Sequence, residues 1–204
     1  MKRFGIVAGA VSGVAALAGA GALVLAGALP SNAATEQVRT VAASNTTAIT
    51  YVPRYFDHST LGYHSRAVLP KTWKQVVLAK WQTRLDDPAH NRMIRFNTAY
   101  SGKISTVTAM NNKIKALKGT RQLHIVGTST LTMRSTTQQG PQTVSTLVYT
   151  YKSGSQTRWV ATRYVGQHGS KTAQVEISVA GSTADSKVLG TVINNATLSV
   201  TRFG

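Results

Sequence analysis

The chain has 204 residues, with 23 Lys and Arg against 6 Asp and Glu, and its formal charge at pH 7 is +17. It contains no Cys, which excludes disulfides, thiolate metal sites and a Cys nucleophile. A charge of this size attracts polyanions, and the attraction weakens with salt because exposed charges are screened over about 10 Å at 0.1 M ionic strength.

Residues 1–33 have the three-part order of a secretory signal peptide. Residues 1–3 carry two positive charges, residues 4–29 are uncharged and rich in Ala and Gly, and residues 31–33 are small enough for a signal peptidase. We expect cleavage after Ala33 or one residue later, and therefore a secreted chain at the cell envelope. The uncharged run is also long enough to span a bilayer, so an uncleaved membrane anchor is the alternative.

The chain after the leader divides into a spacer and one domain. Residues 34–60 are rich in Ala, Thr and Ser and lack sustained periodicity, which predicts a flexible spacer. We expect a single domain over residues 61–204. Its first part has patterns typical of strands, at 62–69, 75–81 and 93–97, and a turn composition at 86–91.

The stretch 104–118 changes to helical spacing. Its apolar residues recur every three or four positions, at Ile104, Val107, Met110, Ile114 and Leu117. This spacing predicts a helix with one apolar face, with Lys113, Lys115 and Lys118 directed elsewhere. Gly119 is a natural end for the helix.

The remaining part is rich in Thr and β-branched residues. It predicts strands at 122–133, 143–151, 157–167 and 172–179, a second helix after the cap at 182–185, and an extended segment at 198–203. The Gly-bearing turns at 153–155 and 168–170 predict that the last three of these strands form an antiparallel meander. The order predicts an α+β fold, in which an antiparallel β-sheet is sandwiched with two main helices.

The opening of this domain, residues 62–73, reads as Gly, aromatic, alternating strand, Pro and Trp, and it resembles the start of PsbP-like domains. Such domains occur in actinobacterial envelope proteins and at the extracellular ends of some of their receptor kinases. Further matches are Asp87-Pro88, the strands at 93–97, 144–151 and 158–165, and the exit at Phe203. The resemblance covers roughly residues 61–203 and implies a non-catalytic fold with no catalytic residues. The chain differs from the kinase-linked members in having no kinase domain and unusually few acids.

Catalytic motifs are absent from the sequence. There is no G-x-S-x-G elbow, S-x-x-K pair or H-E-x-x-H motif, so we expect no enzyme and no cofactor. A secreted hydrolase or metal-dependent enzyme with an unfamiliar site is the alternative, and it would need a pocket that collects Asp86, Asp87 and a histidine such as His90. Oxygen-ligand metal sites want six or more donors, and no second acidic cluster is visible. We therefore predict no metal site.

Binding is the stronger hypothesis for function. No carboxylate occurs from Pro88 to Val175, and four cations, Lys113, Lys115, Lys118 and Arg121, lie at the end of the first predicted helix and just beyond it. We expect them to bind an anionic cell-wall polymer or an acidic envelope protein, with no specific nucleic acid as partner. The alternative is a solvated basic surface, in which the cations only complement the helix dipole or suit an anionic envelope. A purely structural accessory domain is the third hypothesis.

Two cation and aromatic pairs follow one another on a predicted strand, Arg158-Trp159 and Arg163-Tyr164. Aromatics beside arginines can stack on bases or sugars. Because neighbouring residues of a strand point to opposite faces, the simpler expectation is core aromatics with outward arginines.

Overall fold

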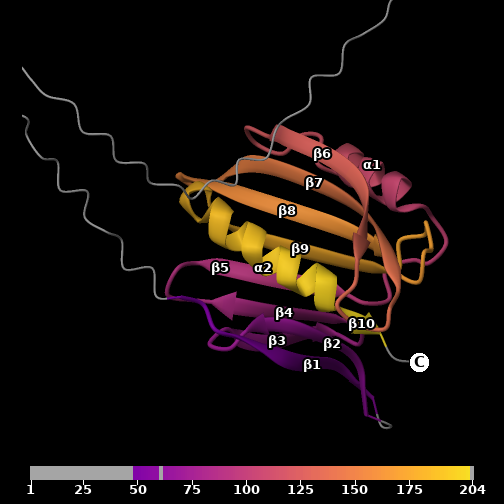
Figure 1. Cartoon of the computed structure of the whole chain (residues 1–204). Helices are drawn as coiled ribbons and strands as arrows, with labels where there is room; N and C mark the ends of the chain where they lie inside the picture. Colours follow the sequence, from indigo (N-terminus) through magenta and orange to yellow (C-terminus); the bar gives the residue numbers. More distant parts are fainter. Residues whose placement is uncertain (1–47, 60–61, 203–204) are drawn as a thin grey trace, which may run out of the picture. The chain divides into compact units, whose positions relative to one another are not determined.

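The computed structural model in Figure 1 describes residues 48–59 and 62–202, which belong to one compact unit, Thr46–Gly204. They form an α+β fold of antiparallel strands and two α-helices. The strands are β1 (Tyr51–Ser59), β2 (Gly62–Pro70), β3 (Lys74–Ala79), β4 (Gln82–Asp87), β5 (Arg92–Asn97), β6 (His124–Arg134), β7 (Pro141–Ser153), β8 (Gln156–Gly166), β9 (Val175–Ser182) and β10 (Thr201–Arg202). The helices are α1 (Thr106–Ala116) and α2 (Ser186–Ser199), and a 3-10 turn, η1 (Thr183–Asp185), precedes α2.

The strands form two sheets. One has the order β1-β2-β10, and the other has the order β3-β4-β5-β9-β8-β7-β6. Every pair of neighbours is antiparallel, and β7, β8 and β9 make the predicted meander. Within the described ranges, no helix is long and apolar enough to span a bilayer.

The first strand, β1, lies where we expected a spacer. It pairs with β2 from Tyr51, opposite Pro70, to Ser59, opposite Gly62. The folded part therefore begins about ten residues earlier than residue 61. The alternation that marks a strand is weak in the sequence here because Pro53 and Arg54 interrupt it, and Phe56 is the side chain that β1 buries in the core. The predicted leader lies outside the described residues.

The turn predicted at residues 86–91 is shorter than expected. Asp86 and Asp87 are the last two residues of β4, and residues 88–91 make the turn to β5. The composition of this stretch is typical of a turn, but the pairing of β4 with β5 continues to Asp87, which lies opposite Arg92. The sequence predicted a strand at 75–81 and none over 82–87, so β4 was missed, and β3 ends at Ala79.

Two clusters of buried side chains lie on opposite faces of the seven-stranded sheet. On β9, Val175, Ile177 and Val179 pack toward α2 in a cluster that also includes Phe56 and Leu69 of the smaller sheet. The alternate residue Ala180 belongs to the second cluster, with Ala109 and Met110 of α1. Figure 1 shows α2 crossing the sheet over β8 and β9. Full burial of an aliphatic or aromatic side chain stabilises the fold by about 1.5–3 kcal/mol each, so these clusters hold the sheets and helices together.

Side-chain caps occur at the start of α1 and at the start of the 3-10 turn η1 that leads into α2, whereas α2 itself has no side-chain cap bond. The Ser105 hydroxyl accepts a bond from the Thr108 amide at 3.0 Å at the start of α1. Before α2, the Ser182 amide and hydroxyl donate to the Asp185 carboxylate at 3.2 and 2.6 Å. These bonds satisfy amide groups that a helix start leaves without partners. The cap predicted at residues 182–185 is therefore confirmed.

We expect Gly166→Ala to destabilise the fold by roughly 1–3 kcal/mol, the usual cost of overpacking. A Cβ at Gly166 would lie 2.1 Å from the carbonyl oxygen of Ser170 and 2.7 Å from that of Thr172, both backbone atoms. The matched control is Gly127→Ala, because a Cβ at that strand position meets nothing within 4 Å. Urea denaturation should give a lower midpoint for the first variant only, and equal midpoints would contradict the packing of the β8–β9 connection.

Candidate functional site

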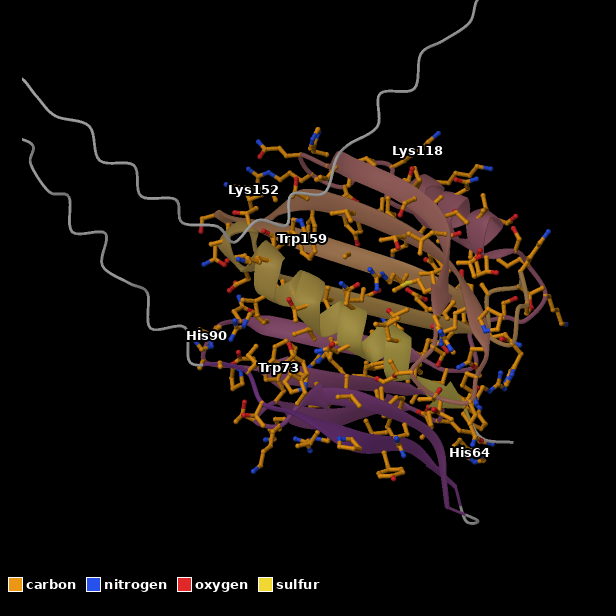
Figure 2. The ribbon with its side chains drawn as sticks, in the orientation of Figure 1. His64, Trp73, His90, Lys118, Lys152 and Trp159 are labelled. Carbon is orange, nitrogen blue, oxygen red and sulfur yellow. The ribbon has the colours of Figure 1, made fainter. Side chains whose placement is uncertain are left out.

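The four predicted cations lie together at the end of α1. Lys113 and Lys115 occupy the last turn of the helix, Leu117 caps it, and Lys118 and Arg121 follow in the connection to β6. We call these four residues, Lys113, Lys115, Lys118 and Arg121, the basic helix end. Lys115, Lys118 and Arg121 are exposed, and Figure 2 shows Lys118 on the side of the molecule that carries α1 and β6. The cations also oppose the negative end of the helix dipole.

Lys113 differs from the other three. It is half-buried, and it follows Ala109 and Met110 of the buried side of α1 at helical spacing. The prediction that Lys113 lies away from the buried face of α1 is wrong. The prediction that Val107 lies on the buried face is also wrong, because Val107 is exposed. The physical reason is that α1 packs through Thr106, Ala109 and Met110, which rotates the apolar stripe by about one residue.

A fifth cation joins the basic helix end from β7. The Lys152 amide donates to the carbonyl oxygen of Arg121 at 2.9 Å, so the last part of β7 lies against the connection that follows α1. Lys152 is 31 residues away in the sequence, and nothing in the local pattern predicts this contact. The structure therefore extends the basic surface to the end of the sheet where β7 turns into β8.

Glu176 is the carboxylate beneath this part of α1. Burial raises its pKa, against the opposing effects of Lys113, Arg95 and a bond from Ser178. Its cross-strand neighbour is Tyr164 of β8, which is 1% exposed. Tyr164 packs on Tyr100 with ring centroids 5.1 Å apart.

The tyrosines of this interior are held neutral. Burial, assisted by the charge of Tyr151 and of Glu176, raises the pKa of Tyr149 to about 12. Burial and the same Glu176 charge raise the pKa of Tyr164 further. Phenols with raised pKa values stay protonated near neutral pH. Glu176 and these tyrosines are therefore buried polar groups beneath α1. A partner can reach the exposed cations of the basic helix end above them.

The acidic side chains are withdrawn from the surface. Among the described residues there are five, and Asp57 is 6% exposed, with the Thr98 hydroxyl donating to it. Burial raises the pKa of Asp57, although this bond lowers it. Three other carboxylates form ion pairs with arginines: Arg84–Asp86 at 2.8 Å, Arg92–Asp87, and Arg92–Asp185 at 3.6 Å. Every described carboxylate is therefore buried or beside an arginine.

The cluster considered as a metal site has a different role. Asp86 and Asp87 are consecutive residues of β4, so they point to opposite faces of the sheet. Each is engaged by an arginine, Arg84 or Arg92, and Asp87 also contacts His90 at 3.0 Å. Within the described parts of the chain, no three His, Asp or Glu side chains are grouped to hold a metal ion. A metal ion would need several of these side chains to point to one place, whereas each carboxylate here pairs with its own arginine.

The two arginine and aromatic pairs lie on β8, whose second half is covered on both faces, whereas Arg158 and Trp159 near its start are partly exposed. Tyr164 is buried as expected, but Arg163 does not point outward. Its guanidinium donates to Asn194 Oδ1 at 2.7 Å and to Thr197 Oγ1 at 3.1 Å, both on α2, and burial lowers its pKa. Because α2 packs over this face of β8, the Arg163 guanidinium is engaged by the helix and serves as a structural contact.

Comparisons with known proteins give structural likeness only. No family model matches the chain, and no curated protein matches it. One similar solved structure is the Saccharomyces cerevisiae Ran-binding protein Mog1p, with 12% identity, 76% of this chain and 96% of that chain covered, and a TM-score of 0.48. Another is LpqN, involved in cell envelope biogenesis of Mycobacterium tuberculosis, with 14% identity, coverage of 76% and 92%, and a TM-score of 0.49. Neither likeness carries a functional argument for this chain.

We expect Glu176→Gln to stabilise the fold at neutral pH. The pKa of Glu176 is raised on folding, so the ionised carboxylate destabilises the folded state once the pH exceeds its unfolded pKa of about 4.3. The free energy of unfolding of the variant should exceed that of the wild type at pH 7, and the difference should shrink as the pH falls toward 4.

Asp87→Asn is the control with the opposite sign. Burial raises the pKa of Asp87, but the bonds from Arg92 and His90 outweigh it and the net pKa is lowered. Its ionised form therefore stabilises the fold above the unfolded pKa of about 3.9, and this stabilisation is lost as the pH falls through the folded pKa. Denaturation at several pH values should show Asp87→Asn less stable at pH 7. A Glu176→Gln difference that stays constant with pH would contradict the buried position of Glu176.

Proposed function

We propose that this chain is an exported, non-enzymatic domain that acts at the cell envelope by binding an anionic wall polymer or an acidic protein through the basic helix end. One observation carries the proposal. Every described carboxylate is buried or beside an arginine, so none of them neutralises the exposed cations of the basic helix end. Because the described carboxylates are buried or beside arginines, they offset little of the positive charge of the exposed lysines and arginines. The leader and the resemblance to PsbP-like domains support the location.

Geometry favours the basic helix end over other cations of the surface. Lys115, Lys118 and Arg121 are exposed within seven residues of chain, and the Arg121–Lys152 backbone bond adds another strand to the same region. Exposed cations at one place raise the local concentration of a polyanion and speed its association. Arg121 can also grip a phosphate or carboxylate with two parallel hydrogen bonds.

The burial and arginine pairing of the carboxylates support the non-enzymatic part of the proposal. A general acid or base must reach a substrate, whereas Asp57 is buried, and Asp86 and Asp87 are held by arginines. His90 is exposed, but its Nδ1 contacts Asp87, whose charge Arg92 already compensates. This arrangement favours positioning of the imidazole over proton transfer.

The test is co-sedimentation of residues 34–204, which contain the whole described unit, with purified cell walls across a salt series. We expect binding that weakens steeply with salt and falls when anionic polymers are stripped from the walls, because each cation that contacts the polymer releases counterions. The triple variant Lys115→Glu, Lys118→Glu, Arg121→Glu should reduce binding at least about tenfold, which corresponds to about 1.4 kcal/mol.

The matched control reverses three exposed lysines on other elements, Lys71, Lys74 and Lys187. It changes the net charge of the chain by the same amount, so a passive effect of charge would reduce binding equally in both triple variants. The proposal requires the helix-end variant to lose clearly more. Equal losses, or binding that survives stripping of the polymers, would contradict it.

A further inference from the structure

A cavity of about 480 Å³ lies at the end of the seven-stranded sheet, where three connections meet. His90 and Asn91 come from the turn between β4 and β5, Lys152 and Gln156 from the ends of β7 and β8, and Thr183 from the start of η1. Figure 2 shows His90 and Lys152 on the same end of the molecule. Its size is in the range of clefts that bind small ligands, about 300–1,000 Å³.

The lining of this cavity has an unusual chemistry. It consists of hydroxyl and amide groups, one imidazole and one ammonium group, with no carboxylate and no Phe, Tyr, Trp or large aliphatic side chain. The His90 imidazole is the one aromatic ring of this lining, so the site offers little stacking surface for a nucleobase or a sugar ring. Its groups can instead donate bonds to hydroxyls and to an anion. This composition suits a flexible, hydroxylated phosphate ester.

One side of the cavity is rigidly built. The Arg92 side chain is buried, and its Nε donates to Asp87 at 2.9 Å, while the same carboxylate contacts Nδ1 of His90 at 3.0 Å. The imidazole is therefore held through Nδ1. Its Nε2 has no contact among the described residues and can interact with a ligand. Fixing a polar group in advance lowers the entropy lost on binding.

The cavity is continuous with positive charge on two sides. Through Lys152 it adjoins Arg121 of the basic helix end. A second hollow of about 460 Å³ shares Asn91. Its lining includes Asp86 and Asp87, which pair with Arg84 and Arg92, and also Arg158, for which no ion pair occurs within the described ranges. A chain of repeating phosphates could therefore contact cations before and after the cavity. A compact anion would use only one of these contacts.

We infer that this cavity is a binding site for a repeat of a polyol-phosphate polymer. The inference rests on the proposed function and deepens it, because it separates phosphodiester-linked polyols from polymers whose charge is carried by carboxylates. Lys152 and His90 contact the phosphate, and Asn91, Gln156 and Thr183 contact the polyol hydroxyls. The basic helix end holds the neighbouring repeats by charge.

Calorimetric titration of residues 34–204 with two oligomers of equal charge tests this inference, using oligo(glycerol phosphate) and oligo(glutamate) at one salt concentration. We expect the double variant Lys152→Gln, Gln156→Ala to bind the glycerol phosphate oligomer about tenfold more weakly than the wild type. Its affinity for the glutamate oligomer should fall less than about threefold. Gln156→Ala alone removes no charge and should weaken only the glycerol phosphate oligomer. The control, Lys187→Gln with Gln138→Ala, removes the same groups from exposed positions elsewhere and should change neither affinity.

Equal losses for both oligomers in the cavity variant, or no loss for either, would overturn the inference. The proposed function is tested separately by the triple variant of Lys115, Lys118 and Arg121, which should weaken both oligomers. If the triple variant changes neither affinity, the proposed function fails. In that case the cavity variant still tests the inference about the cavity, through the ratio of its affinities for the two oligomers.

Discussion

The rest of the structure depends on the central strands β8 and β9 being covered on both faces. A strand with two buried faces places every second residue against one helix and the others against the second, so polar residues there need partners inside the protein. Arg163 finds them on α2, and Thr162 bonds to Ser178 at 2.9 Å across the two strands. Glu176 lies on the other face, beneath α1. These contacts determine which charged groups are available at the surface.

The scarcity of acids then sets the electrostatics. The ion pairs of Arg84 and Arg92 occupy three carboxylates near the β4–β5 turn, and burial removes Asp57 and Glu176. Surface ion pairs contribute little to stability, but the nearly buried Arg92–Asp87 pair organises a turn and orients His90. The same residues that resemble a metal or catalytic cluster in the sequence thus serve to shape the end of the sheet.

Local patterns predict most of the fold, because hydrophobic period and turn residues act within a few positions. They locate α1, the β7–β9 meander and the cap at Ser182. They miss β1, whose Pro53 and Arg54 interrupt the alternation and whose pairing depends on β2. The exposed cations of the basic helix end were accessible to the same reasoning. Lys152 and the cavity near His90 were not, because they depend on three connections that meet only after the sheet has formed.

Charge and stability are coupled in this chain. Like charges on a folded domain repel, and a compact state concentrates them, so a strongly cationic domain loses some stability that a balanced one would keep. An anionic partner that binds only the folded state relieves this repulsion and also stabilises the fold by mass action. Exposed cations near α1 and at the strand ends permit such binding without disturbing the buried clusters. The surface that makes the isolated domain less stable is therefore the surface through which a polyanion can stabilise it.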